Sequence, residues 1–240
     1  MGGKKHYEKD FKYFYCRYDE PTYTKEIKIK ILGKLANEYN LGDMLNELND
    51  YVGDIDIPIA RKSIKILAKI AINLPEVAKA LMVNLVAFNR MEKVHLTNEI
   101  VIAFYEILRK YPNLFTDIKQ SFIQNCSSIN ETESLEAMIW ILGTFADQIE
   151  DSPYILEEFI NGEFENVPGP FEKYPSSLKS VILTQTVQTF VKRPPETINI
   201  LRTIFKLILN DDGESLLLKD HAAFYYRALR DSPQSVSYTH

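Results

Sequence analysis

The apolar residues of this chain recur at steps of three and four, in one segment after another. The stripe from Leu135 to Ile149 is the most regular, and another comprises Ile57, Ala60, Ile64, Leu67, Ala68 and Ala71. Such spacing places the apolar side chains on one face of an α-helix. The same period recurs in residues 27–39, 41–52, 77–88, 100–111, 118–123, 178–191, 198–209 and 216–229. No run of residues alternates strictly between apolar and polar side chains with hairpin turn residues at its ends, so the sequence predicts an all-α chain.

Residues that begin or end helices agree with this pattern. Four prolines stand at expected first turns, where the missing N–H costs nothing: Pro58, Pro75, Pro153 and Pro195. Asn130 is expected to cap the helix that follows it, with Glu131 and Glu133 as an acidic first turn. Gly53 and Gly162 are expected where helices stop.

The predicted helices pair into repeats. First helices of successive pairs are expected to begin near Thr22, Asp56, Thr97, Asn130, Ser176 and Glu214. This spacing is close to that of HEAT and armadillo repeats, roughly the high thirties to mid forties. Because one hairpin cannot cover its own apolar face, neighbouring hairpins must stack. The predicted fold class is therefore all-α, an α-solenoid of HEAT/armadillo-like helical hairpins, and an irregular helical bundle is the alternative.

The solenoid is predicted to span residues 11–231, and residues 1–10 are interpreted as a disordered or vector-derived N-terminus. Residues 232–240 are expected to form a loose C-terminal tail. A long exposed loop is predicted at residues 162–177, which hold Glu163, Glu165, Pro168, Gly169, Pro170, Glu172 and Pro175.

Residues 7–18 are rich in aromatic side chains and also contain Lys9, Lys12 and Arg17. We interpret this segment as the last helix of a preceding repeat, with Phe11, Phe14 and Tyr15 packing inward. The alternative is a stacking patch for nucleic acid.

Charge is uneven along the chain. The whole has a formal net charge of −5; residues 1–120 carry 19 Lys and Arg against 16 Asp and Glu, and residues 121–240 carry 9 against 17. This mild acidity argues against a nucleic-acid partner. The asymmetry suggests different partners at the two ends, although solvated helix faces that happen to differ would also explain it.

Compartment follows from what is missing in the sequence. The first twenty residues lack the apolar core of a signal peptide, and no stretch approaches the roughly 20 apolar residues of a membrane span. Cys16 and Cys126 cannot form a disulfide framework and are interpreted as reduced thiols in the cytosol.

A search for catalytic or metal-binding motifs finds none. There is no phosphate loop, dinucleotide-binding glycine motif or nucleophile elbow. Cap or surface roles are expected for the four isolated histidines, His6, His95, His221 and His240. Neighbouring carboxylates such as Glu157 and Glu158, or Asp211 and Asp212, point in different directions on a helix.

Cys126 lies near a predicted helix end, which can lower a thiol pKa, but the sequence offers no base to pair with it. The sequence therefore predicts no catalytic, cofactor-binding or metal residue, no small-molecule substrate and no enzyme activity.

Several short segments, in order, resemble those of one protein family. Residues 137–143, AMIWILG, resemble the AMIWI-(V/L)-G segment of the trunk of the β-adaptins, the large β subunits of clathrin-associated adaptor complexes. Further segments resemble YNDP at 18–21, RKA at 61–63, RKYPN at 109–113, KKPSET at 192–197 and YWRLLSTDP at 226–233. The resemblance runs from about Phe11 to Pro233.

The resemblance implies a HEAT-like solenoid that forms the C-terminal half of a longer trunk. In the family, this part cradles the medium subunit within a heterotetramer that selects membrane cargo and recruits clathrin. It implies a non-enzymatic scaffold in vesicle-mediated transport, with the medium subunit and other adaptor subunits as partners. The implied location is cytoplasmic, peripheral on the cytosolic face of trans-Golgi, endosomal or plasma-membrane clathrin-coated vesicles.

The chain also departs from the family pattern. It lacks the N-terminal half of the trunk, where contacts with the Arf-class GTPase lie, and the hinge through which clathrin binds. Two stretches that resemble a clathrin box fail at Asn210 and Lys219. The 162–177 loop is longer than the family's link, and no partner-binding residue can be carried over.

Two other readings remain open at the level of sequence. An unrelated HEAT-repeat scaffold, such as a nuclear-transport receptor or a phosphatase regulatory subunit, explains the period but not the ordered matches. An enzyme on a HEAT-like fold, such as a DNA-base glycosylase, needs a basic groove with a buried carboxylate, and the net charge of −5 argues against it.

Overall fold

The computed structural model describes residues 10–90, 93–164, 167 and 169–230. Within these ranges the chain forms eleven α-helices and four short 3-10 helices, and no strand. This confirms the all-α class. The predictions for residues 1–9 and 231–240, including His6 and His240, lie outside the described residues, as do those for Glu165 and Pro168.

The chain divides into two compact units, one ending at Ile129 and the other beginning at Asn130. The helices of the first are α2 (Thr22–Leu35), α3 (Leu41–Val52), α4 (Ile57–Asn73), α5 (Pro75–Asn89), α6 (Val94–Leu108) and α7 (Phe115–Asn125), with η1 (Phe11–Phe14), η2 (Pro112–Leu114) and η3 (Cys126–Ser128). Those of the second are α8 (Thr132–Thr144), α9 (Ser152–Asn161), α10 (Ser176–Lys192), α11 (Pro194–Asn210) and α12 (Leu216–Arg230), with η4 (Phe171–Lys173).

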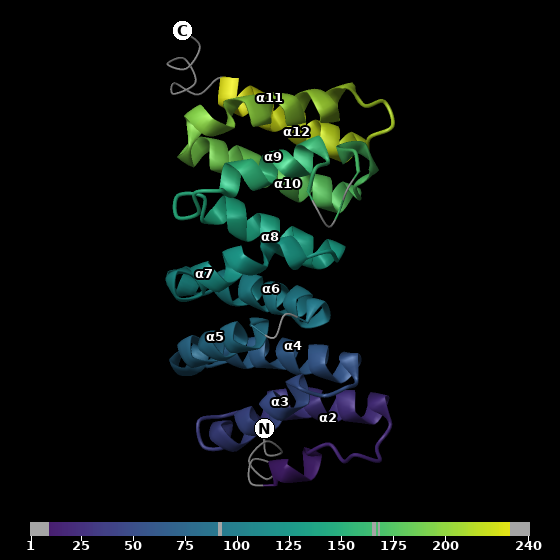
Figure 1. Cartoon of the computed structure of the whole chain (residues 1–240), viewed down its shortest axis with the longest axis vertical. Helices are drawn as coiled ribbons and strands as arrows, with labels where there is room; N and C mark the ends of the chain where they lie inside the picture. The colour runs from purple at the N-terminus through teal and green to yellow at the C-terminus, as the bar shows by residue number, and fades with distance from the viewer. Residues whose placement is uncertain (1–9, 91–92, 165–166, 168, 231–240) are drawn as a thin grey trace. The chain divides into compact units, whose positions relative to one another are not determined.

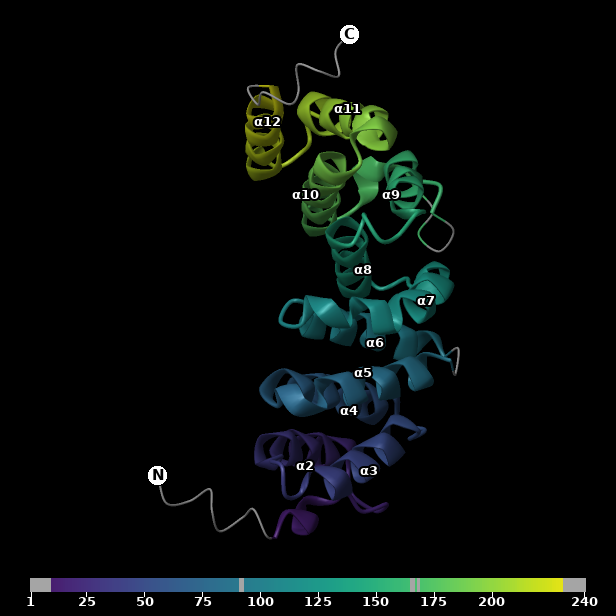
Figure 2. The same ribbon diagram turned by 90° about the vertical axis from the view of Figure 1, so that its left-hand side faces the viewer.

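Within each unit, alternate helices stack in layers. In the first unit α4 packs on both α2 and α6, while α5 packs on α7 (Figure 1). In the second unit α10 packs on α8 and α12, and α9 packs on α11; Figure 2 shows α10 and α12 on one side and α9 and α11 on the other. This is the predicted stacking of hairpins in an α-solenoid, and the first helices of the pairs begin at most three residues from the predicted positions.

The residues predicted to begin or end helices do so, with one exception. All four prolines lie at the first or second position of a helix. Gly162 ends α9 with φ at +74°, a left-handed conformation that glycine adopts without strain. The cap is predicted one residue too early, at Asn130, because Glu131 is the residue that precedes the first helical residue of α8.

The apolar stripes form the core. Ile64 and Leu67 of α4 and Phe104 and Ile107 of α6 are fully buried. The stripe from Leu135 to Ile149 is also buried, but the helix that carries it ends at Thr144. The last three residues of the pattern, Phe145, Ala146 and Ile149, are buried in turns.

The aromatic segment near the N-terminus is not the predicted helix. Its described part forms only the four-residue turn η1, in which Phe11 is buried while Phe14 and Tyr15 are half-buried. The reason is that side chains take the backbone donors a longer helix needs. The Cys16 N–H donates to the hydroxyl of Tyr51 at 2.7 Å, and the Arg17 N–H donates to the Glu20 carboxylate at 3.0 Å.

The prediction of an exposed loop at residues 162–177 is wrong for its aromatic side chains. Phe164, Phe171 and Tyr174 are all buried. Phe164 stacks on Phe159 of α9 with ring centroids 4.1 Å apart, and Tyr174 meets the same ring edge-on at 6.4 Å. This stretch therefore extends the core of the second unit, because aromatic residues alternate with its prolines and glycines.

A buried ion pair anchors the end of this stretch. Lys179 of α10 and Glu214, which precedes α12, are joined at 2.5 Å with both side chains almost fully buried. Lys179 also lies 5.7 Å from the ring centre of Phe171. Burial alone raises the pKa of Glu214, but the bonds from Lys179, the Ser215 N–H and the Ser176 hydroxyl together lower it.

Candidate functional site

The side chains examined for catalysis do not converge. No described group of three or more His, Cys, Asp or Glu is placed to hold a metal ion. His95 lies at the start of α6, and His221 is exposed on α12. The lowered thiol pKa considered for Cys126 is wrong, since burial raises it to about 12. None of the helices in the described ranges has the length and apolarity needed to cross a membrane.

The segment RKYPN joins two repeats. Lys110 donates to the backbone carbonyl of Ile72 at 2.6 Å, and the hydroxyl of Tyr111 donates to the same oxygen at 3.2 Å. Ile72 lies in the last turn of α4, where carbonyl groups lack helical partners. The end of α6 thus caps the end of α4. The positive charge of Lys110 also interacts favourably with the negative end of the α4 helix dipole.

The segment KRPPET makes the equivalent joint in the second unit. One guanidinium nitrogen of Arg193 donates to the backbone carbonyls of Ile149 and Glu150, each at 2.9 Å, and of Ala146 at 3.3 Å. The preceding Lys192 donates to the carbonyl of Thr144, the last residue of α8. In both units, therefore, the end of one stacked helix caps the end of the stacked helix before it.

The segment AMIWILG supplies a close helix crossing. A Cβ atom on Gly143 would lie 2.6 Å from the Cβ of Gln185 and 3.0 Å from its backbone oxygen. Only a residue without a side chain permits this approach of α8 to α10. The neighbouring Met138, Ile139 and Leu142 are fully buried.

The segment RKS contributes a buried ionic contact between α4 and α6. Arg61 Nε lies 3.1 Å from Glu99, and Lys65 Nζ lies 3.5 Å from its other carboxylate oxygen. Glu99 is fully buried, and desolvation raises its pKa in spite of these two cations. This carboxylate belongs to the joint between repeats.

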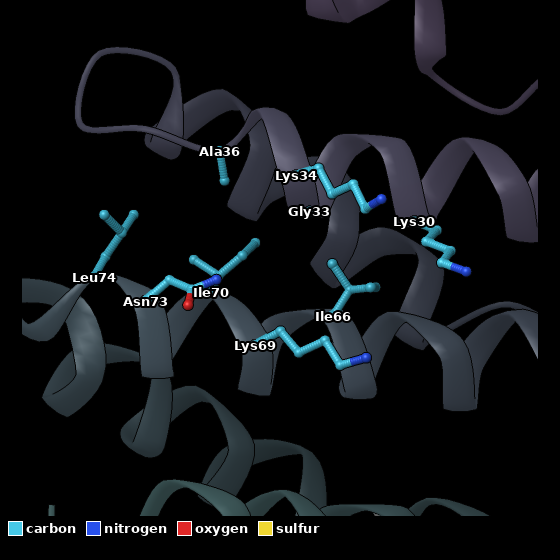
Figure 3. Close-up of a pocket in the computed structure, with 9 residues that line it drawn as sticks. All are labelled: Lys30, Gly33, Lys34, Ala36, Ile66, Lys69, Ile70, Asn73 and Leu74. Carbon is cyan, nitrogen blue, oxygen red and sulfur yellow. The ribbon is translucent and has the colours of Figure 1, made fainter. Parts of the chain in front are cut away.

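Four of the segments that carry the family resemblance thus join helices. A surface groove lies between α2 and α4. We call it the basic groove, and it is lined by Lys30, Gly33, Lys34, Ala36, Ile66, Lys69, Ile70, Asn73 and Leu74, with a volume of about 560 Å³. In Figure 3 the lysines of α2 and the lysine of α4 extend to the same side of it, with Ile66 between them and Ile70 nearer to Ala36 and Leu74.

A glycine lets the two helices approach each other at the groove. A Cβ atom on Gly33 would lie 2.5 Å from Ile66 Cγ2, so α2 and α4 approach closely there and no side chain fills the groove from α2. Ile66 and Ile70 are buried at its floor, while Lys30, Lys34 and Lys69 are exposed at its rim.

The basic groove is not among the sites predicted from the sequence. The signal was present, because Lys30 and Lys34 are four residues apart, as are Lys65 and Lys69, and such pairs share a helix face. The net charge of residues 1–120 does not reveal these lysines, because acidic residues elsewhere in that half offset them.

Comparison with known proteins identifies the family. A model of the family described as "Adaptin N terminal region" matches residues 5–233. The chain belongs to the adaptin family. This confirms the resemblance seen in the short segments, and it does not support the readings as a nuclear-transport receptor, a phosphatase regulator or a DNA-base glycosylase.

Similar proteins include "Beta-adaptin-like protein A" of Arabidopsis thaliana, which is 37% identical over 223 residues, or 92% of this adaptin chain and 25% of that protein. "AP-1 complex subunit beta-1" of Rattus norvegicus is 28% identical over 93% of the chain and 23% of its own length. "AP-2 complex subunit beta" of Schizosaccharomyces pombe is 35% identical over 65% of the chain and 23% of its own length.

The fold is shared with a larger assembly. The chain matches part of a homology model of the full-length AP-3 complex in an intermediate open conformation, with a TM-score of 0.72 at 15% identity. The match covers 96% of this chain and 41% of the other, and at this identity it shows the fold alone. The adaptin chain spans about a quarter of the length of the curated relatives that it matches.

Proposed function

We propose that this adaptin chain is a non-enzymatic scaffold of a heterotetrameric clathrin adaptor complex in vesicle-mediated transport. The observation that carries the proposal is the family match over residues 5–233, in a chain built of stacked helix hairpins. Stacked hairpins expose long rows of helix surface, which suit the large interfaces of permanent complexes.

The proposed partners are the medium subunit and the other subunits of the complex. Relatives named as β subunits of the AP-1 and AP-2 complexes support this. The second unit, which begins at Asn130, contains 9 Lys and Arg against 17 Asp and Glu. This excess of acid favours a partner surface with basic residues.

The proposed location is cytoplasmic, on the cytosolic face of clathrin-coated vesicles at the trans-Golgi, endosomes or plasma membrane. In this proposal the complex brings the chain to the membrane and helps sort cargo. Clathrin is recruited by other parts of the complex, since Asn210 and Lys219 interrupt the two stretches that resemble a clathrin box.

Isothermal titration of the chain with the N-terminal domain of an adaptor medium subunit tests the proposal. We expect binding with a dissociation constant of about a micromolar or tighter. We also expect binding to weaken as salt is added, because the second unit is acidic. Absence of binding by a chain whose circular dichroism shows folded helices would contradict the proposal.

A further inference from the structure

Positive charge is concentrated in two neighbouring helices. The sequences of α2 and α4 together contain eight Lys and Arg and one acidic residue, Glu26. The whole first unit has 19 basic and 16 acidic residues, so its other segments are acidic on balance. Because α2 packs directly on α4, these like charges lie on adjoining helices and repel one another.

Part of this charge is neutralised within the fold, and part is left free. Lys28 pairs with Glu20, and Arg61 and Lys65 pair with Glu99. The three lysines at the rim of the basic groove are different. Lys30, Lys34 and Lys69 are exposed, and none of them forms an ion pair with any described residue.

The floor of the groove has the opposite character. Ile66 and Ile70 lie beneath it and are almost fully buried, and the half-buried Ala36 and Leu74 offer apolar surface at one end (Figure 3). A volume of about 560 Å³ is within the usual range for a ligand pocket, and it holds more than a single ion. A ligand that fills it therefore needs negative charge for the rim and an apolar group against Ala36 and Leu74.

We propose that the basic groove binds an acidic peptide segment of a partner protein, with carboxylates against the three lysines and an apolar side chain against Ala36 and Leu74. Bringing carboxylates to the rim relieves the repulsion between the two helices, and burying an apolar side chain adds a contribution that salt does not screen. A phosphate or a lipid headgroup satisfies the rim but leaves the half-buried Ala36 and Leu74 uncovered, so the composition of the groove favours a peptide.

The proposal does not depend on membership of an adaptor complex. A chain that binds the medium subunit but not acidic peptides contradicts the groove alone. A chain that binds such peptides but not the medium subunit contradicts the function proposed above and leaves the groove intact.

Fluorescence anisotropy tests the groove. The probe is a labelled short peptide of Asp and Glu with Leu at every fourth position, titrated with the whole chain. Reversing the rim charges together (Lys30→Glu, Lys34→Glu and Lys69→Glu) is expected to weaken binding by about ten-fold or more. The matched control reverses three other exposed cations, Lys93→Glu, Lys173→Glu and Arg202→Glu, and leaves the affinity within about two-fold.

Two further probes separate the rim from the floor. Ala36→Trp places an indole in the groove without changing its charge, and is expected to weaken binding by about ten-fold while circular dichroism stays unchanged. A peptide with Ser in place of Leu is also expected to bind more weakly. If it binds equally well, or if the rim and control reversals weaken binding alike, the proposal is wrong. Binding to phosphatidylserine vesicles that needs the rim lysines, without binding to the peptide, would make the groove a membrane site and overturn the proposal.

Discussion

Replacing Gly143 by Ala should show how much the crossing of α8 and α10 depends on a single missing side chain. The added methyl group would lie 2.6 Å from the Cβ of Gln185 and 3.0 Å from its backbone oxygen. Normal contacts between such atoms begin at about 3.4 Å. Neither the Cβ nor the backbone oxygen of Gln185 moves unless α10 moves.

The magnitude is the balance of two terms. Forcing a methyl group into a packed contact costs about 1–3 kcal/mol, whereas Gly→Ala inside a helix gains about 0.8–1 kcal/mol in helix propensity. We therefore expect Gly143→Ala to lower the free energy of unfolding by up to about 2 kcal/mol. Gly42 of α3 is the matched control, because a Cβ atom there meets nothing within 4 Å. Gly42→Ala is expected to raise the free energy of unfolding by about 0.5–1 kcal/mol.

Urea denaturation followed by circular dichroism measures both variants against the parent chain. The two substitutions add the same methyl group, so opposite signs can only come from the surroundings of each glycine. If Gly143→Ala stabilises the chain as Gly42→Ala does, the close crossing of α8 and α10 is refuted.

Three further predictions follow from other contacts. Arg193→Met removes the caps on three carbonyls and should lower the free energy of unfolding, measured by urea denaturation, by about 2–3 kcal/mol. The control Arg202→Met, at an exposed position, should change it by no more than about 0.5 kcal/mol, and equal losses would contradict the capping role. Iodoacetamide should modify Cys126 at least about ten-fold more slowly than the half-buried Cys16 in the folded chain, with mass spectrometry as readout and equal rates as the contrary result. Because the pKa of Glu214 is lowered, its carboxylate stabilises the fold above the ordinary carboxyl pKa, and this contribution disappears as pH falls through the lowered value. The difference in free energy of unfolding between the parent and Glu214→Gln should therefore shrink on acidification. A constant difference down to about pH 3 would count against the ion pair.

Most of the helix pattern is legible in the sequence because apolar spacing acts locally. The stripes through Leu67 and Phe104 predict buried helix faces, and both side chains are fully buried. Gly162 is legible for the same reason, since a left-handed helix end depends on that residue alone.

Helix ends that depend on residues distant in sequence cannot be predicted in this way. The apolar period continues past Thr144 to Ile149, but the helix stops because Lys192 binds the carbonyl of Thr144 and Arg193 binds that of Ile149. Near the N-terminus, the hydroxyl of Tyr51 takes the N–H of Cys16, and the predicted helix is lost. In both cases the deciding side chain is more than thirty residues away in sequence.

The short segments that resemble the family also needed the structure for their interpretation. As sequence, Lys110 and Arg193 are basic residues that could equally contact a partner. In the fold both cap the end of a neighbouring helix. The basic groove was hidden for a related reason, because it exists only where Gly33 brings α2 against Ile66 of α4.

The claim that this chain holds other adaptor subunits can be tested most directly by hydrogen–deuterium exchange, with and without a saturating amount of the medium subunit's N-terminal domain. We predict slower exchange in peptides from the acidic second unit, residues 130–230, while the buried helices of the first unit are unchanged. Identical exchange along the whole chain, with the partner present and both proteins folded, would contradict the account.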